Sequence, residues 1–295
     1  MLINKAIPRS TALALVLAML AGADTRPAAA AGNSAAQQEA MPLPAELPAL
    51  GSVDNQELAS RLLTAAYGAY DKRQGCWIGV NKVKTDSGEW QEFRYCMKLD
   101  RLDALTADSG KRLYVLAAGQ AIAGAEPVGQ WTPGLVGAFV LEDHGGHTEV
   151  IAAGDRIASG LTGGSAPSQW KPVRLGPSDY WGWQNTEGYE LQGDSHSRYV
   201  LLAPFGRGIR NLALQGIPQS HDDSGACPDD HCASTQWQAQ LKVDESGGDS
   251  VYPLLLTISG TDQGKDLQSR TLKLPFDRKR WSYTRPDDAL FKDER

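Results

Sequence analysis

The sequence predicts a mainly β fold: an antiparallel β-sandwich, or two packed sheets built from hairpins, with one N-terminal α-helix. Three observations lead to this fold class. From residue 76 onward, apolar-rich segments of strand length follow one another, and turns rich in glycine, proline and aspartate separate them. A single segment near residue 54 has the apolar spacing of a helix. Runs of strands without alternating helices are typical of sheet layers packed around a core.

The first 23 residues have the features of a secretion signal peptide. Lys5 and Arg9 form a basic start, an apolar run from Ser10 to Leu20 follows, and Ala21 to Ala23 offers the small residues that a signal peptidase reads. The run is shorter than the about 18 apolar residues that a membrane span needs. We therefore expect cleavage after Ala23, with a cut after Ala30 or a retained N-terminal anchor helix as the alternatives.

The rest of the chain divides at about residue 53. Residues 24–52 are rich in alanine, proline, glutamine and serine, and they predict a disordered linker because they cannot bury enough apolar surface to offset the ordering entropy. Residues 53–295 are expected to form the β-rich domain, with sub-lobes of about 53–172 and 173–295 as a finer division.

The net charge of −6 becomes −8 when the signal peptide, with two basic and no acidic residues, is removed. A negatively charged protein is not attracted to the phosphate backbone, so we expect no nucleic-acid partner.

One helix is expected at the start of the domain. Asp54 is a natural N-cap, Glu57 lies three residues later as in a capping box, and Gly75 is the expected terminator. Five residues at helical spacing would form the packing face: Leu58, Leu62, Ala65, Ala66 and Tyr70.

Strand-length segments account for most of the remaining domain. Two hairpins, 138–154 and 199–215, have similar lengths and turn positions, which is consistent with a duplicated unit. Pro253 is expected at a strand start or edge because proline donates no ladder hydrogen bond. The other predicted strands are a hairpin of 76–84 and 90–99, a strand over 111–122, and a meander of 236–244, 251–259 and 267–276.

The four cysteines predict two disulfides, because an even number in an exported chain is typical of a stabilising framework. Three pairings are possible, and we favour the local one, Cys76–Cys96 with Cys227–Cys232. Closing a loop of roughly 20 residues stabilises the fold by about 3 kcal/mol in the chain-entropy model.

An aromatic and glycine-rich stretch is the strongest indication of a binding surface. Trp181 and Trp183 should point to one face of a strand because side chains alternate. If exposed, this face would bind a protein or glycan partner, and if buried it is core. The candidate partner-binding residues are Tyr180, Trp181, Trp183, Tyr189 and Tyr199.

The loop from Ser220 to Cys232 is the candidate metal site. Clustered carboxylates suit Ca²⁺, which takes six to eight oxygen ligands, although the spacing is not that of an EF-hand. A zinc site would combine His221, His231 and one carboxylate, and the remaining interpretation is an acidic turn closed by a disulfide. The candidate ligands for Ca²⁺ are Asp222, Asp223, Asp229 and Asp230.

The tripeptide Gly193-Asp194-Ser195 resembles the nucleophile block of the GDSL family of esterases. The resemblance implies Ser195 as a nucleophile in an α/β fold, with the block near the mature N-terminus and an Asp-x-x-His pair near the C-terminus. Here the tripeptide lies late in a chain that predicts β structure, and no histidine follows His231. His221 or His231, together with Asp229, would have to complete the triad.

These features favour an exported protein, periplasmic or secreted, that binds a protein or glycan partner through its aromatic and glycine-rich face without catalysis. Two alternatives stay open: a structural envelope protein stabilised by Ca²⁺, and a serine esterase that uses Ser195. We expect no membrane span after signal cleavage and no cofactor other than Ca²⁺.

Overall fold

The computed structural model describes residues 47–84, 88–107, 110–124, 128–214, 216–227, 232–247 and 250–291. The predicted signal peptide, most of the predicted linker, Asp229, Asp230 and His231 lie outside the described residues. Within this part of the chain, no helix combines the length and apolar character that a membrane crossing requires.

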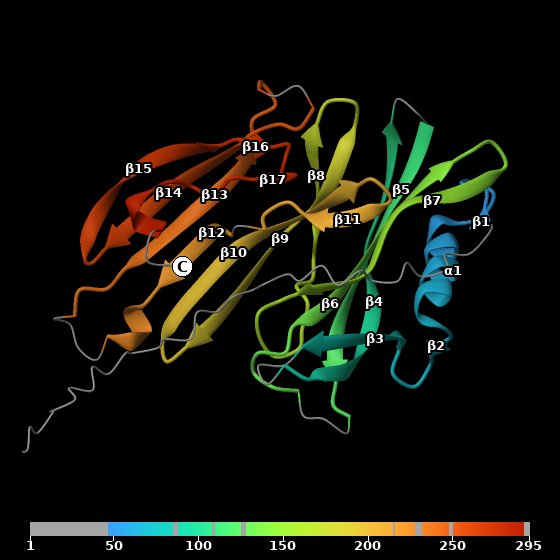
Figure 1. Cartoon of the computed structure of the whole chain (residues 1–295), viewed down its shortest axis with the longest axis horizontal. Helices are drawn as coiled ribbons and strands as arrows, with labels where there is room; N and C mark the ends of the chain where they lie inside the picture. Colours follow the sequence, from blue (N-terminus) through green and yellow to red (C-terminus); the bar gives the residue numbers. More distant parts are fainter. Residues whose placement is uncertain are drawn as a thin grey trace, which may run out of the picture. The chain divides into compact units, whose positions relative to one another are not determined.

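The described chain is mainly β, with one α-helix near its start, as predicted (Figure 1). The elements are β1 (Leu47–Pro48), α1 (Asn55–Tyr67), β2 (Tyr70–Asp71), β3 (Cys76–Lys84), β4 (Trp90–Ala107), β5 (Gly110–Ile122), β6 (Gly134–Asp143), β7 (His147–Ser159), β8 (Lys171–Gly176), β9 (Tyr180–Leu191), β10 (Asp194–Phe205), β11 (Gly208–Asn211), β12 (Ile217–Asp222), η1 (Ser224–Ala226), β13 (Gln236–Val243), β14 (Leu254–Asp262), β15 (Lys265–Leu274), β16 (Phe276–Asp277), β17 (Ser282–Tyr283) and η2 (Ala289–Phe291).

Antiparallel hairpins build the sheet almost throughout. β2 to β7 pair in chain order, β8 to β10 form a second run, and β10 continues through β12, β13 and β14 to β15. The short strand β11 pairs with β10 and joins the two runs by a parallel bridge to β7, with Gly208 opposite Ala153. β16 and β17 form a separate two-stranded sheet.

The side-chain packing explains why the strands form layers. One cluster of buried side chains lies between α1 and the β3–β7 sheet, a second covers β10 and β12–β15, and a third joins the faces of β5–β7 to those of β9 and β10. β6 takes part in two of them, because Leu135 and Phe139 face the helix side while Val136 and Val140 face β9 and β10. A strand buried on both faces is a continuous apolar run. The segment GLVGAFVLED of β6 is such a run.

The helix begins where the sequence predicts, with Asp54 at the N-cap, but the capping box does not form. The Asp54 side chain makes no cap hydrogen bond, and Glu57 pairs instead with Arg61 one turn later at 2.6 Å. The helix ends at Gly68, which adopts a φ of 87° that glycine tolerates, rather than at Gly75. This earlier end places Tyr70 in β2.

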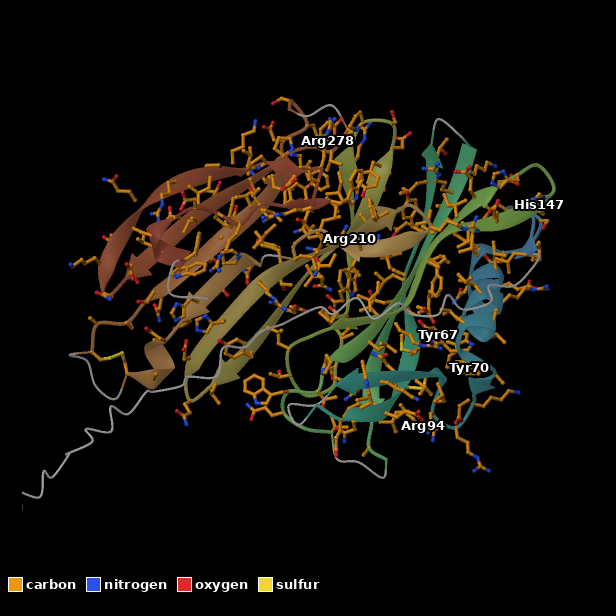
Figure 2. All side chains as sticks on the ribbon, viewed as in Figure 1. Tyr67, Tyr70, Arg94, His147, Arg210 and Arg278 are labelled. Carbon is orange, nitrogen blue, oxygen red and sulfur yellow. A yellow bond between two sulfur atoms is a disulfide. The ribbon has the colours of Figure 1, made fainter. Side chains whose placement is uncertain are left out.

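Most of the predicted packing face of α1 is confirmed. Leu58, Leu62 and Ala66 are buried against the sheet, whereas Ala65 is exposed. Tyr67, at the last turn (Figure 2), donates a hydrogen bond of 2.7 Å to the carbonyl of Asp155 on β7. Helix α1 is thereby attached to the sheet by both apolar packing and a polar contact.

The predicted strands 76–84, 111–122 and 236–244 coincide with described strands to within a residue or so, and both local disulfides form. Cys76 and Cys96 lie 5.4 Å apart between their Cα atoms on the paired strands β3 and β4. Pro253 precedes β14, as its missing N–H requires. The hairpin expected over 199–215 has only a four-residue return strand, β11, so it differs from the longer β6–β7 hairpin.

Candidate functional site

The strand β10 carries the candidate site at its N-terminal end. Side chains alternate along a strand, so Asp194 and His196 lie on one face and Ser195 lies on the other. Further along the first face, Val200 and Leu202 enter the core between the two sheet runs. The face therefore passes from buried core to partly exposed polar residues within one strand.

The pairing register brings a second histidine to the same place. His196 lies opposite Tyr189 on β9 and opposite His221 on β12. The His196 and His221 rings stack with centroids 4.1 Å apart and an interplanar angle of 21°, and Tyr189 stacks on the other side of His196 at 5.2 Å. Directly opposed side chains on neighbouring strands have Cβ atoms about 5 Å apart, which suits such stacking.

A β-bulge in β12 creates this register. Arg198 pairs with Pro218, but the next residue of β10, Ser197, pairs with Ser220. The register therefore shifts by one residue between them, because β12 contains the extra residue Gln219. Without the bulge, Ser220 would lie opposite His196, and His221 would point to the other face. The hydroxyl of Ser197 contacts both the Gln219 side chain and Ser220 Oγ, and these contacts stabilise the bulge.

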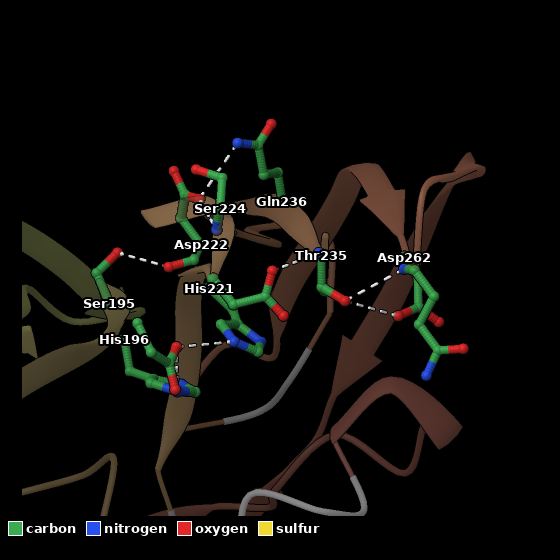
Figure 3. Close-up of polar contacts among 11 residues, drawn as sticks. Ser195, His196, His221, Asp222, Ser224, Thr235, Gln236 and Asp262 are labelled. Atoms are coloured by element: carbon green, nitrogen blue, oxygen red, sulfur yellow. Dashed lines mark hydrogen bonds and ion pairs between the residues drawn. The ribbon is translucent and has the colours of Figure 1, made fainter. Parts of the chain in front are cut away.

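Both imidazoles converge on one carboxylate. Nε2 of His221 lies 3.0 Å from Oδ1 of Asp194, and Nε2 of His196 lies 3.0 Å from Oδ1 and 3.1 Å from Oδ2 (Figure 3). One ligand atom from each of the three residues lies within 4.8 Å of the others, and this is the one such group of three that the described residues contain. We call Asp194, His196 and His221 the His–Asp cluster.

The cluster is accessible but not fully exposed. The side chains of His196 and His221 are 22% and 21% exposed, and that of Asp194 is 41% exposed. On one side, Trp131 contacts Tyr189 edge to face at 6.0 Å and is itself 58% exposed. On the other side Trp237, a core residue, contacts His221 in a T-shaped arrangement with ring centroids 6.2 Å apart.

A buried ion pair separates the cluster from the core on the same face. Glu187, whose side chain is 5% exposed, accepts hydrogen bonds from Arg198 Nε at 2.8 Å and Nη2 at 2.6 Å. Its other oxygen accepts from the Gly160 N–H at 2.6 Å and from Ser159 Oγ at 3.1 Å. These contacts attach β9 to the end of β7 and fix the strand that carries Tyr189.

Three of the predicted partner-binding residues are part of the core or are hydrogen-bonded to it. Trp183 is fully buried and packs on Tyr114 at 5.4 Å, and Tyr199 is buried with its hydroxyl donating to the Ala239 carbonyl. The hydroxyl of Tyr180 donates to the Pro204 carbonyl, and burial raises the pKa of Tyr180 to about 12.

The other two differ in position. Trp181 is partly buried against the core between the two sheet runs, on the same side as Trp183, as the alternation predicts. Tyr189 alone among the five belongs to the row of rings at the His–Asp cluster. The structure therefore does not gather the predicted residues into one exposed platform.

The described carboxylates of the acidic loop shape its turn. Asp222 Oδ1 accepts hydrogen bonds from the Ser224 N–H at 3.0 Å and from Gln236 Nε2 at 3.2 Å. The pKa of Asp222 is held below its usual value, and the largest cause is a hydrogen bond with the Ser224 side chain. Asp223 Oδ1 accepts from the Thr235 N–H at 2.6 Å. Neither carboxylate belongs to a group of three ligands within the described residues.

Ser195 has no histidine partner in the described part of the chain. Its hydroxyl donates to the main-chain carbonyl of Asp222 at 3.3 Å and points away from the ring of His196 (Figure 3). The geometry that the GDSL resemblance implies, with a histidine beside the serine, is thus not formed by His221.

Comparison with known proteins finds no matching family model, no matching curated protein and no matching solved structure.

The sequence analysis considered His221 only as a zinc ligand or triad base, named Asp194 only within the GDSL-like tripeptide, and did not select His196. The available signal is the spacing Asp194-x-His196 in a segment with strand character, because alternate residues share a face. The third member, His221, could not be added from the sequence, since its orientation depends on the bulge at Gln219.

Proposed function

We propose that the protein is an exported, non-catalytic binding protein whose ligand is a divalent transition-metal ion, bound by Asp194, His196 and His221. The observation that supports the proposal is the convergence of two imidazole nitrogens and one carboxylate. In a tetrahedral zinc site with bonds of about 2.0–2.1 Å, ligand atoms lie roughly 3.3 Å apart. The separations of 3.0 Å between the Asp194 oxygen and each nitrogen are within a few tenths of an ångström of this value.

The donor set favours a transition metal over Ca²⁺. Calcium takes six to eight oxygen ligands, whereas imidazole nitrogen with carboxylate oxygen suits zinc, copper, nickel or iron. Because a carboxylate only accepts hydrogen bonds, the Nε2 atoms that face Asp194 carry protons when no metal is bound. Coordination then requires the opposite tautomer, with the proton on Nδ1, which histidine can adopt without a change in net charge.

The packing of the rings also favours coordination over stacking on a glycan. Tyr189, His196 and His221 cover one another's faces at 4.1–5.2 Å, so they present edges rather than flat surfaces to a ligand. A protein or glycan partner at this face remains a proposal, which rests on Tyr189 and the exposed Trp131 beside it. A structural role for Ca²⁺ in the 220–232 loop is a separate proposal that the contacts of Asp222 and Asp223 do not favour.

Export is supported by two disulfides, which are compatible with an extracellular or secreted protein. Together with the signal-like residues 1–23, they lead us to propose the periplasm or the extracellular space as the location. Metal binding outside the cytoplasm would allow the protein to capture or buffer the ion.

The test is calorimetric titration of Zn²⁺ into the oxidised, EDTA-treated protein. We expect one Zn²⁺ per chain, and His196→Ala and His221→Ala should each weaken binding by at least roughly 10- to 100-fold, since even residues that only support metal ligands contribute this much. Ser195→Ala is the matched control, because its side chain lies between the same neighbours but on the opposite face.

Two results would contradict the proposal. One is absence of Zn²⁺ binding by the unaltered protein. The other is loss of binding in His221→Ala but not in His196→Ala, which would move the ion to the 220–232 loop.

A further inference from the structure

Two hairpin turns that are far apart in the sequence meet at one point of the surface. Phe205 begins the turn between β10 and β11, and its ring lies 5.0 Å from that of Trp281, in the turn between β16 and β17. Trp281 also packs edge to face on Phe276 at 5.3 Å. The guanidinium of Arg210 lies 5.2 Å from the centre of the Phe205 ring.

The two turns are rich in basic residues. Arg210 and Arg278, each labelled in Figure 2, come from the two turns or the short strand beside them. We define the basic–aromatic patch as Phe205, Arg207, Arg210, Arg278, Lys279 and Arg280. Residues 205–210 and 277–281 contain five basic residues and one acidic residue, Asp277, in a chain whose net charge is −6.

The one acidic residue has a structural role. Asp277 Oδ1 accepts the backbone N–H groups of Lys279 at 2.8 Å and Arg280 at 3.2 Å, so it shapes the turn that exposes their side chains. Its ion pair with Arg280 is long, at 3.7 Å, and the Arg280 side chain is 68% exposed. Exposed pairs of this kind contribute little, so the Arg280 guanidinium remains available to a ligand.

The other turn is equally accessible. The side chain of Arg207 is 77% exposed, and its contact with Glu149 is an exposed pair at 3.4 Å. Phe205 is 45% exposed at the end of β10. An exposed aromatic ring surrounded by basic side chains has the composition of a membrane-surface contact, since aromatic side chains partition into the interface and Lys and Arg attract anionic headgroups.

We propose that the basic–aromatic patch docks the protein on an anionic lipid bilayer. Charge complementarity supports this occupant, because the patch is positive in a chain that is negative as a whole. Peptides are recognised in grooves or along sheet edges. Here the charges are carried by the ends of two hairpins, which suit a flat surface. The proposal is independent of metal binding at the His–Asp cluster.

The test is co-sedimentation with vesicles of phosphatidylcholine containing 0 or about 30% phosphatidylglycerol, at low salt and in 1 M NaCl, where the screening length falls to about 3 Å. Each neutralised side chain near an anionic surface should weaken partitioning roughly fivefold, so Lys279→Gln/Arg280→Gln should weaken it about 25-fold. The matched control, Lys72→Gln/Arg73→Gln, neutralises two exposed side chains in another turn that an aspartate shapes.

All variants are prepared without residues 1–23, the expected signal peptide, so a difference in sedimentation between them reports the patch. Selective loss in Lys279→Gln/Arg280→Gln, with a smaller loss in Phe205→Ala, would support the proposal. Equal sedimentation of all variants, or binding that requires no phosphatidylglycerol, would overturn it. Retention of the unaltered protein by an immobilised acidic peptide, without sedimentation with vesicles, would also overturn it in favour of a protein partner.

Discussion

The buried carboxylate of Glu187 gives the sharpest test of how the two sheet runs are held together. Replacing Glu187 by glutamine keeps the shape but removes the charge, and it places an amide NH₂ group against donors. One oxygen of Glu187 accepts from Arg198 and the other from Ser159 and Gly160, so either orientation of the amide leaves donors unsatisfied. The side chain is 5% exposed, so water cannot replace the lost bonds.

The expected loss follows from these contacts. Breaking a buried pair by altering one partner costs roughly 3–5 kcal/mol, but the Arg198 side chain is 39% exposed and can turn to water. Leaving the Gly160 N–H and the Ser159 hydroxyl poorly satisfied costs about 1–3 kcal/mol. We therefore expect Glu187→Gln to lower the free energy of unfolding by about 3 kcal/mol, which for a domain of this size lowers Tm by roughly 6–12 °C.

The assay is urea unfolding followed by tryptophan fluorescence, in which Trp183 reports the core between the sheet runs. Glu57→Gln is the matched control, because Glu57 pairs with Arg61 on the exposed face of α1 and should contribute only about 0.3–0.5 kcal/mol. If Glu187→Gln and Glu57→Gln had the same effect, the buried contacts of Glu187 would not attach β9 to β7 as we infer.

Two further predictions concern stability. Replacing Cys76 and Cys96 by serine should lower the free energy of unfolding by about 3 kcal/mol in urea titrations, and by more than the same change at Cys227 and Cys232, because the latter close a loop with a sequence separation of only 5. Since burial raises the pKa of Tyr180 from 10.0 to about 12, the stability from its protonated form is complete below pH 10 and is lost as the pH rises from 10 to 12. Unfolding free energies measured over this interval should therefore fall more steeply for the unaltered protein than for Tyr180→Phe, and equal slopes would contradict the assignment.

Features that depend on neighbouring residues were predictable. Asp54 marks the start of α1, and Leu58, Leu62 and Ala66 pack as their spacing indicates. The capping box failed at Glu57 because an arginine one turn later competes for its carboxylate. The spacing of three residues between Asp54 and Glu57, taken alone, does not indicate that competition.

The candidate site was predictable only in part. The stretch from Tyr180 to Tyr199 contains Asp194 and His196 of the site, but the alternation of side chains along a strand does not indicate which face of the strand is buried. Trp183 is buried because residues of β5 and β6 pack on it. Tyr189, six residues later on the same strand, lies outside this cluster of buried side chains and is partly exposed.

The sequence by itself determined the mainly β fold, the helix and the local disulfides, because strand alternation, helical spacing and short loops act between residues close in the chain. The tertiary structure alone decided that His221 faces His196, since pairing register is a property of two strands and one extra residue, Gln219, reverses the face. It also decided that Phe205 meets Trp281. Such contacts form only when distant segments bury their apolar surface together, and no local pattern encodes the partner.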